Sequence, residues 1–174
     1  MSPQAANRIA IHSGDITALD VDAIVNAANE RLAPGGGVCG AIHRAAGPAL
    51  GAACRKAAPC PTGEARITPG FLLAAKHVIH TVGPVYESAD VSERMLRLAH
   101  RSSLRLARAN RLASIAFPAI SCGVFGYPPG EAAALALDEC RAESRGLKEI
   151  RFVLFGAEMY GVWERAARAL LTDR

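Results

Sequence analysis

The residues best suited to chemistry lie between Asp22 and Gly47, where a polar side chain precedes a run of glycines and a short helix. The segment from Asp22 to Ala28 runs into apolar residues and predicts a buried strand, which places Asn29 just beyond its end. Ligands of open α/β sheets bind outside the carboxyl ends of the strands, so the Asn29 amide could hold hydroxyl groups there. Alternatively, Asn29 only closes a turn by bonding to its own backbone.

Three consecutive glycines, Gly35 to Gly37, follow Pro34 and lead into a helix expected from Val38 to Ala46. Glycine permits positive φ and lets backbone N–H groups come close to a ligand. The N-terminus of a helix presents unpaired N–H groups and a partial positive charge. The loop and the helix together predict an anion site, best suited to phosphate.

Gly35, Gly37 and Gly40 also fit the G-x-G-x-x-G pattern of dinucleotide-binding folds. In that pattern the first glycine follows the strand directly, and an acid ends the next strand about 20 residues later. Here the residues from Asn29 to Pro34 intervene, and no such acid follows. The P-loop pattern is absent from the chain. We therefore expect neither of these nucleotide sites.

A second glycine loop, Ser121 to Gly126, follows a strand expected from Ala113 to Phe117. A small hydroxyl and two glycines at a strand exit could wrap the other side of a diphosphate. Phe125 stands between glycines, and from the sequence alone it could either cover a ligand or anchor the loop in the core.

Two further residues stand at expected strand ends. Asp15 follows the strand expected from Arg8 to His12, where a carboxylate could accept a hydrogen bond from an exocyclic amine or cap the next turn. Phe155 closes the strand expected from Ile150 to Phe155, where it could stack on a ring, although phenylalanine at such a place is more commonly part of the core.

The remaining elements alternate along the chain in a way that favours a three-layer α/β/α sandwich with a central mixed, mostly parallel sheet. His77 and His80 stand three residues apart on one expected strand, so they should face opposite sides and serve structural roles. The other expected strands are 65–68 and 77–82, and the other expected helices are 47–56, 91–110, 130–143 and 158–171.

Five motifs, in order along most of the chain, resemble those of macrodomains, the ADP-ribose-binding modules, and specifically their MacroD-type hydrolase branch. These motifs are Gly14-Asp15-Ile16-Thr17, VNAAN with GGGV, GAIHRAAG, VIHTVGP and FPAISCGVFGYP. The resemblance implies the macrodomain fold. It also implies that Asn29 holds the distal ribose of ADP-ribose and that Asn26 supports the Asn29 loop.

The resemblance implies further roles in ligand binding. Asp15 would read the adenine, Phe155 would stack on it, and Phe125 would cover the distal ribose. His43 matches the histidine of the family, whereas Cys39 replaces the usual aspartate. The residues expected to bind ligand are Asp15, Ile16, Asn29, Gly36, Gly37, Val38, Cys39, Ser121, Cys122, Gly123, Val124, Phe125 and Phe155, and those expected in catalysis are Asn29, Cys39 and His43.

The implied reaction is hydrolysis of an ester between the anomeric carbon of ADP-ribose and a carboxylate, on a protein side chain or on acetate. Backbone N–H groups could meet the developing charge and a diphosphate oxygen could position water, so no metal or cofactor is expected. Two alternatives stay open. The chain could be an ADP-ribose reader without turnover, or Cys39 could be a nucleophile, because a helix N-terminus and a nearby histidine can activate a thiol.

The composition favours one domain over residues 1–174, because 51% of these 174 residues are hydrophobic and such a chain can bury one sizeable core. No apolar run is long enough to span a membrane, and residues 1–7 lack the apolar centre of a signal peptide. The odd number of cysteines, without any C-x-x-C pair, disfavours both a disulfide framework and zinc. We expect a cytoplasmic monomer whose partners are ADP-ribose and ADP-ribosylated proteins or O-acetyl-ADP-ribose.

The net charge of +4, with 17 arginines among 20 basic residues, raises the possibility of nucleic-acid binding. A basic stripe occupies one expected helix, with residues spaced three or four apart. No aromatic residue interleaves it, and a modest positive charge gives only salt-sensitive binding. We therefore expect a solvated face and no nucleic-acid partner. The stripe consists of Arg94, Arg97, Arg101, Arg105, Arg108 and Arg111.

Overall fold

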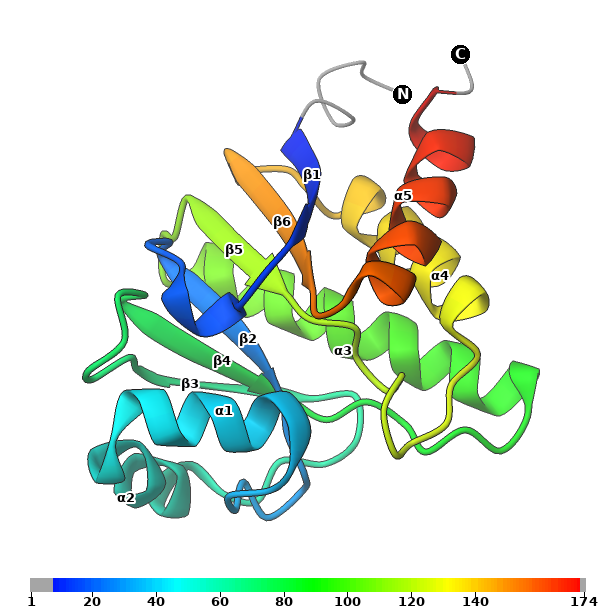
Figure 1. Cartoon of the computed structure of the whole chain (residues 1–174). Helices are drawn as coiled ribbons and strands as arrows, with labels where there is room; N and C mark the ends of the chain where they lie inside the picture. Colours follow the sequence, from blue (N-terminus) through cyan, green and yellow to red (C-terminus); the bar gives the residue numbers. More distant parts are fainter. Residues whose placement is uncertain (1–7, 173–174) are drawn as a thin grey trace.

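The structure is a computed structural model that describes residues 8–172. Within these residues six strands form one sheet in the order β1-β6-β5-β2-β4-β3. The β3–β4 pair is antiparallel and every other neighbouring pair is parallel. Helices cover both faces of the sheet (Figure 1), which confirms the predicted α/β/α sandwich with a mixed, mostly parallel sheet.

Every strand and helix expected from the sequence is present, with slightly different boundaries. Phe155 lies just after the last strand instead of closing it. The strands are β1 (Ile9–Ser13), β2 (Ala23–Ala27), β3 (Ala65–Pro69), β4 (His77–Thr81), β5 (Ser114–Phe117) and β6 (Glu149–Leu154). The helices are the 3-10 turn η2 (Ile16–Ala18), α1 (Gly37–Ala46), α2 (Pro48–Ala57), α3 (Ala89–Ala109), α4 (Pro129–Ala142) and α5 (Ala157–Thr172).

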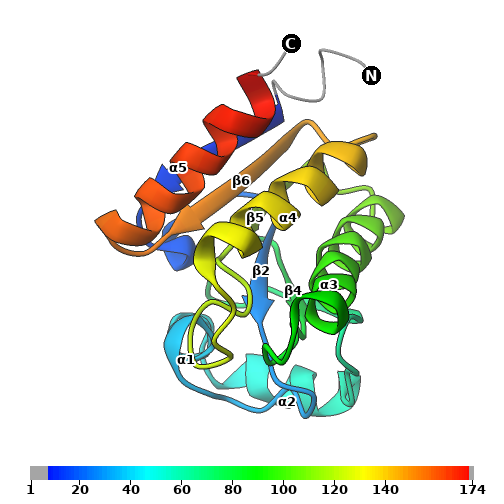
Figure 2. The ribbon, with the colours of Figure 1, turned by 90° about the vertical axis from the view of Figure 1, so that its right-hand side faces the viewer.

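Strand β2 shows how the sequence produces two covered faces. Ala23 and Val25 belong to the core cluster beneath α3, α4 and α5, whereas Ile24 belongs to the cluster beneath α1 and α2. Successive side chains of a strand point to opposite faces, so a sheet covered on both sides requires apolar residues at consecutive positions. Figure 2 shows α3, α4 and α5 arranged along one face of the sheet.

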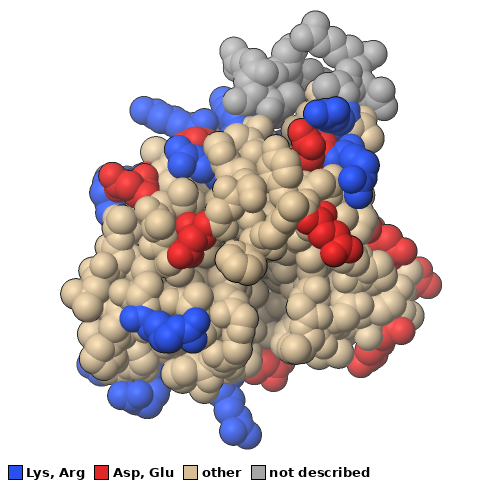
Figure 3. Space-filling view, in the orientation of Figure 1, with Lys and Arg blue, Asp and Glu red and all other residues tan. Residues whose placement is uncertain are grey.

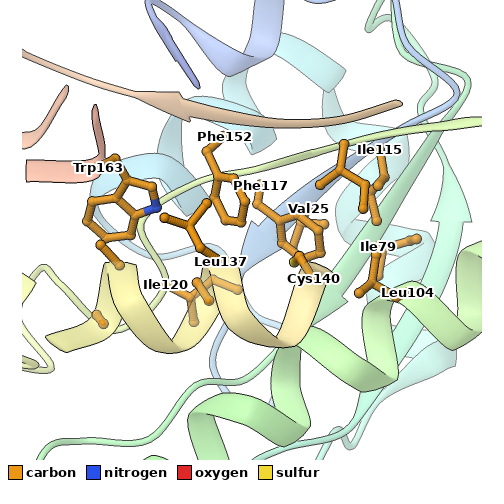
Figure 4. Packing of buried hydrophobic residues seen from close by; sticks show 14 of the residues in the cluster. Val25, Ile79, Leu104, Ile115, Phe117, Ile120, Leu137, Cys140, Phe152 and Trp163 are labelled. Atoms are coloured by element: carbon orange, nitrogen blue, oxygen red, sulfur yellow. The ribbon is translucent and has the colours of Figure 1, made fainter. Parts of the chain in front are cut away.

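Aromatic packing fixes the centre of the larger core cluster. Phe117 of β5 and Phe152 of β6 stack with ring centroids 5.5 Å apart. Trp163 of α5 and Leu137 of α4 close the cluster from the helical layer (Figure 4). Because β5 and β6 are held at these rings, the loops that follow them leave the sheet from fixed points.

Only part of the arginine stripe on α3 is exposed to solvent, although the sequence predicted a solvated face for all of it. Three of its members face α4, where carboxylates of that helix and its C-cap pair with them. The remaining members, Arg94, Arg105 and Arg111, are exposed. The expectation was therefore wrong for half of the stripe, which instead joins two helices. The pairs between the helices are Arg97 with Asp138 and Glu139, Arg101 with Glu139 and Glu143, and Arg108 with Glu143.

The described chain contains no helix that is long and apolar enough to cross a membrane. All five cysteines carry free thiols, and all but Cys122 are buried.

Candidate ligand-binding site

The parallel strands bring the expected site residues to one edge of the sheet. Because β1, β2, β4, β5 and β6 run in the same direction, the loops that follow them leave from the same side. Asp15 follows β1, Asn29 follows β2, the second glycine loop follows β5 and Phe155 follows β6. Figure 3 shows this part of the surface hollowed near the centre of the view, where residues other than Lys, Arg, Asp and Glu predominate.

The Asn29 side chain is held by its own loop. Its Nδ2 donates to the Ala33 carbonyl at 2.9 Å, and its Oδ1 accepts from the Ala33 N–H at 3.0 Å. The turn-closing role considered for Asn29 is therefore present. An amide has a second N–H and a second lone pair, so the same side chain can still contact a ligand hydroxyl.

The first glycine loop leaves open space in front of α1. Helix α1 begins at Gly37, where φ is 55°, and its N-cap Gly36 makes no side-chain hydrogen bond to the helix. A Cβ placed on Gly36 or Gly37 would meet no protein atom within 4 Å. This turn, at the N-terminus of a helix, therefore lies beside a space that an anion could enter. The space beside Gly40 is filled, because a Cβ placed there would lie 2.5 Å from the Gly35 carbonyl oxygen.

The second glycine loop, residues 121–126, is strained and anchored at both ends. Ser121 has a φ of 66°, and its carbonyl accepts from the Tyr127 N–H at 2.9 Å. Its Oγ is buried, and no group in the described part of the chain bonds to it. A Cβ on Gly83 would lie 2.2 Å from that Oγ, so only glycine at 83 allows the loop this close. Beyond this anchor, a Cβ on Gly123 would again meet no protein atom within 4 Å.

The outer part of the same loop is more exposed. Val124 is fully exposed, and Phe125 is half-buried with its carbonyl accepting from the Tyr86 N–H at 2.8 Å. Phe125 is thus not part of the buried core. Burial raises the pKa of the half-buried Cys122 thiol to about 12, so Cys122 stays protonated at neutral pH.

Asp15 and Phe155 lie at the far end of the edge, after β1 and β6. Asp15 Oδ1 caps η2 by accepting from the Thr17 N–H at 2.9 Å and from the Thr17 hydroxyl at 2.7 Å. These bonds lower the pKa of Asp15 and leave Oδ2 available. Phe155 is 90% exposed, so the alternative that it is a core residue is wrong. Ile16 is buried and can offer a ligand only its backbone.

Cys39 and His43 both lie on α1 but no hydrogen bond joins them among the described residues. The Cys39 sulfur accepts from Asn26 Nδ2 at 3.7 Å and donates to the Ala33 carbonyl at 3.8 Å. His43 is half-buried, and its Nε2 is buried without a partner in residues 8–172. Burial lowers the pKa of His43. The thiol–base hydrogen bond that commonly activates a nucleophilic cysteine is therefore absent among residues 8–172.

Sequence reasoning missed a buried polar cluster below this turn. His80 of β4 lies between two polar side chains. Its Nδ1 is 3.1 Å from Asn26 Nδ2, and its Nε2 is 3.0 Å from Thr68 Oγ1. Asn26 and His80 are cross-strand partners in the parallel register of β2 and β4. The signal available in the sequence was a polar residue, Asn26 or His80, that directly follows two apolar residues in each of two buried strands.

Other features lie outside this edge. A shallow apolar hollow between α4 and α5, lined by residues such as Ala134, Val162 and Ala166, contains none of the expected site residues. In residues 8–172 no three or more His, Cys, Asp or Glu side chains are grouped to hold a metal ion. The ends of the parallel strands therefore define the candidate site.

The fold and this edge define a class of protein, an α/β/α sandwich with a ligand site built from two glycine loops at the carboxyl ends of its parallel strands. The Macro domain family model matches residues 25–136. The chain belongs to the macro domain family.

Known relatives match nearly the full length of this chain. A macro domain-containing protein of Vibrio parahaemolyticus is 50% identical over 165 residues, which cover 92% of this chain and 97% of the relative. The macrodomain of Oceanobacillus iheyensis with ADP superposes with a TM-score of 0.91 at 40% identity, covering 95% of this chain and 93% of the other. The Trypanosoma brucei macrodomain in complex with ADP-ribose gives a TM-score of 0.86 at 46% identity, covering 91% and 68%.

Proposed function

We propose that this chain binds ADP-ribose at the carboxyl edge of its sheet and hydrolyses the ester between the anomeric carbon and a carboxylate. The carboxylate would belong to a protein Asp or Glu side chain, or to acetate in O-acetyl-ADP-ribose. The observation that carries the proposal is that Asn29 and both glycine loops follow strands that end at one edge of the sheet, with open space beside Gly36, Gly37 and Gly123. The ligands of the Oceanobacillus and Trypanosoma macrodomains, ADP and ADP-ribose, support the ligand class.

The backbone would hold the diphosphate. N–H groups of Gly36, Gly37 and Val38 at the start of α1 would meet one side, and those of residues 121–124 the other. At the far end, Asp15 Oδ2 would accept from the adenine amine while Phe155 offers its exposed ring for stacking.

The reaction would depend on positioning. Asn29 would hold the distal ribose beneath Phe125, so that a diphosphate oxygen can orient a water molecule towards the ester. Water would add its hydroxyl group on one side of the broken bond and its remaining proton on the other, giving ADP-ribose and a free carboxylic acid. Backbone N–H groups would stabilise the developing negative charge. Cys39 would line the pocket as a neutral thiol, and the scheme assigns no step to a metal.

A non-catalytic reader is the second candidate. Cys39 stands where the hydrolase branch usually has aspartate, and neither hydrogen bond of its sulfur reaches His43. A reader would bind ADP-ribose through the same loops without releasing product.

One assay separates these functions. The protein is incubated with O-acetyl-ADP-ribose and with peptides mono-ADP-ribosylated on glutamate, arginine or serine, and free ADP-ribose is measured. We expect release from the carboxylate esters only. Calorimetry with ADP-ribose runs beside it. Binding without release identifies the reader, and a folded sample that gives no binding heat rejects both candidates.

The proposal extends to the setting of the reaction. We propose that residues 1–174 act as one domain and as a cytoplasmic monomer on ADP-ribosylated proteins or O-acetyl-ADP-ribose. Analytical ultracentrifugation tests the oligomeric state, and cell fractionation tests the location.

A further inference from the structure

A chain of hydrogen bonds runs beneath the candidate site, from strand β3 to the Asn29 loop. Its inner members are buried, with exposures of 4% for Thr68, 0% for His80 and 1% for Asn26. Thr68 Oγ1 lies 3.0 Å from His80 Nε2, and Asn26 Nδ2 lies 3.1 Å from His80 Nδ1. Both ring nitrogens of His80 are therefore engaged.

The partners of His80 select one tautomer. When the Thr68 hydroxyl donates its proton to the Pro69 carbonyl at 3.2 Å, its Oγ1 can only accept from His80. His80 then carries its proton on Nε2, and Nδ1 accepts from the Asn26 amide. The Cys54 sulfur also contacts the ring, 3.7 Å from Nε2. Burial, together with the neighbouring His43, lowers the pKa of His80 to about 4, so the ring is neutral at physiological pH.

The chain continues from Asn26 to Asn29. The second N–H of the Asn26 amide points to the Cys39 sulfur at 3.7 Å, and the Cys39 thiol donates to the Ala33 carbonyl at 3.8 Å. Ala33 in turn is bonded to both polar atoms of the Asn29 amide. Each proton is used once along this path. A thiol suits the Cys39 position because it accepts and donates, whereas an ionised aspartate could only accept.

In its present orientation the Asn26 amide leaves one polar atom without a hydrogen bond. Its Oδ1 is buried and has no partner in the described part of the chain. A buried acceptor without a donor is unfavourable, because it has lost its bond to water. His80 nevertheless holds the amide in this orientation, with its N–H groups directed at His80 and Cys39 and its carbonyl left unpaired.

We propose that His80 is a positioning residue for the reaction. Acting through Asn26, Cys39 and Ala33, it keeps the Asn29 loop in the conformation that aligns the distal ribose, while Thr68 fixes its tautomer. The effect on turnover rests on the proposed hydrolase function. The hydrogen-bond chain itself does not.

The test compares His80→Leu with His80→Gln. Leucine removes both bonds of the ring, whereas the glutamine amide can accept from Asn26 and donate to Thr68. We expect His80→Leu to lower turnover on the order of tenfold or more with little change in ADP-ribose affinity, because misalignment acts on rate. His80→Gln should recover most of the turnover. The matched control is His100→Leu, which removes an equally buried histidine on the other face and should leave turnover per folded molecule unchanged.

The outcomes separate the two proposals. A folded His80→Leu protein with wild-type turnover, or a His80→Gln protein that loses as much as His80→Leu, overturns the role of His80. Nitrogen-15 NMR of the wild type reports the His80 tautomer without any turnover, and a proton on Nδ1 would overturn the chain even if His80→Leu does not fold. The wild type could also release no ADP-ribose while its His80 carries the proton on Nε2. This result rejects the hydrolase function alone and supports the chain of hydrogen bonds.

Discussion

The face of the sheet beneath α3, α4 and α5 is filled mainly by apolar and aromatic side chains, whereas the face beneath α1 carries a buried polar chain. Two histidines make the comparison direct. The ring of His100 packs against Phe117 at 5.2 Å, and its Nδ1 bonds within its own helix to the Leu96 carbonyl. His80 instead uses both nitrogens to join β2, β3 and β4. One histidine fills space, and the other links elements that lead to the candidate site.

This difference assigns separate tasks to the two faces. Apolar burial stabilises the fold without specifying the direction of any polar group. Hydrogen bonds between buried groups are directional and contribute less net stability, but they fix where an amide points. Changes beneath α3, α4 and α5 should therefore affect stability, and changes beneath α1 should affect turnover.

The largest expected effect comes from Phe152→Ala. The ring is fully buried against Phe117, so truncation should lower the free energy of unfolding by about 3–5 kcal/mol. Turnover of the remaining folded protein should stay the same. Urea denaturation and single-turnover assays at low temperature measure the two quantities. A folded Phe152→Ala protein with impaired chemistry would show that the two faces are not separable in this way.

Acid should destabilise both faces alike. The pKa of each buried histidine is about 4, below the ordinary value of 6.5, chiefly because of burial. Between these values the unfolded chain binds more protons than the folded one, so stability falls as pH drops from 6.5 and levels off near 4. At 1.36 kcal/mol per pKa unit, each histidine accounts for up to about 3 kcal/mol.

Urea denaturation at pH 7 and pH 5 measures this loss. His80→Gln and His100→Gln should each reduce the pH dependence by a similar amount. If only one of them does, the other histidine is already charged or hydrated in the folded protein.

Asn29→Ala tests the functional face at its outer end. It removes both bonds to Ala33 and the amide proposed to hold the distal ribose. Turnover should fall on the order of a hundredfold, because small misalignments of a reacting group are costly in rate. The affinity for ADP-ribose should change much less. Steady-state kinetics and calorimetry check the two, and equal losses would make Asn29 a simple binding residue.

Cys39→Ala should have the smallest effect. Its two hydrogen bonds, at 3.7 and 3.8 Å, link Asn26 to Ala33, so their loss should lower turnover about as much as His80→Leu does, on the order of tenfold. Cys39→Ser keeps a donor and an acceptor and should stay closer to the wild type. A nucleophilic cysteine requires the opposite result, with turnover abolished in Cys39→Ala and an ADP-ribosyl adduct on the wild-type protein by mass spectrometry.

Several structural features could be predicted from local patterns alone. The apolar run before Asn29 predicted β2, because a strand covered on both faces needs apolar residues at consecutive positions. The glycines before α1 and around Phe125 predicted loops that approach a ligand, and both loops do border open space. The signals in these cases are confined to a few neighbouring residues.

Other features depended on residues far apart in the chain. Arg97 and Arg101 were expected to be solvated, but both also pair with carboxylates of α4. Only the bond from Arg97 to Glu93 stays within α3 among these pairs. Phe155 could have been a core residue, and only the way β6 ends leaves its ring exposed. Charge pairing and burial depend on how helices and strands pack together, and a local sequence pattern carries no information about that packing.

The sequence by itself therefore determined the order of strands and helices, the two glycine loops and the positions of Asn29, Cys39 and His43 along the chain, because hydrophobic period and backbone freedom are local properties. Only the tertiary structure decided that Asn26 stands beside His80 and that the path continues through Cys39 to Asn29. The register between two parallel strands, and the seating of α1 on them, bring these groups within bonding distance. Hydrogen bonds act only over such distances, so their partners are settled when the chain packs.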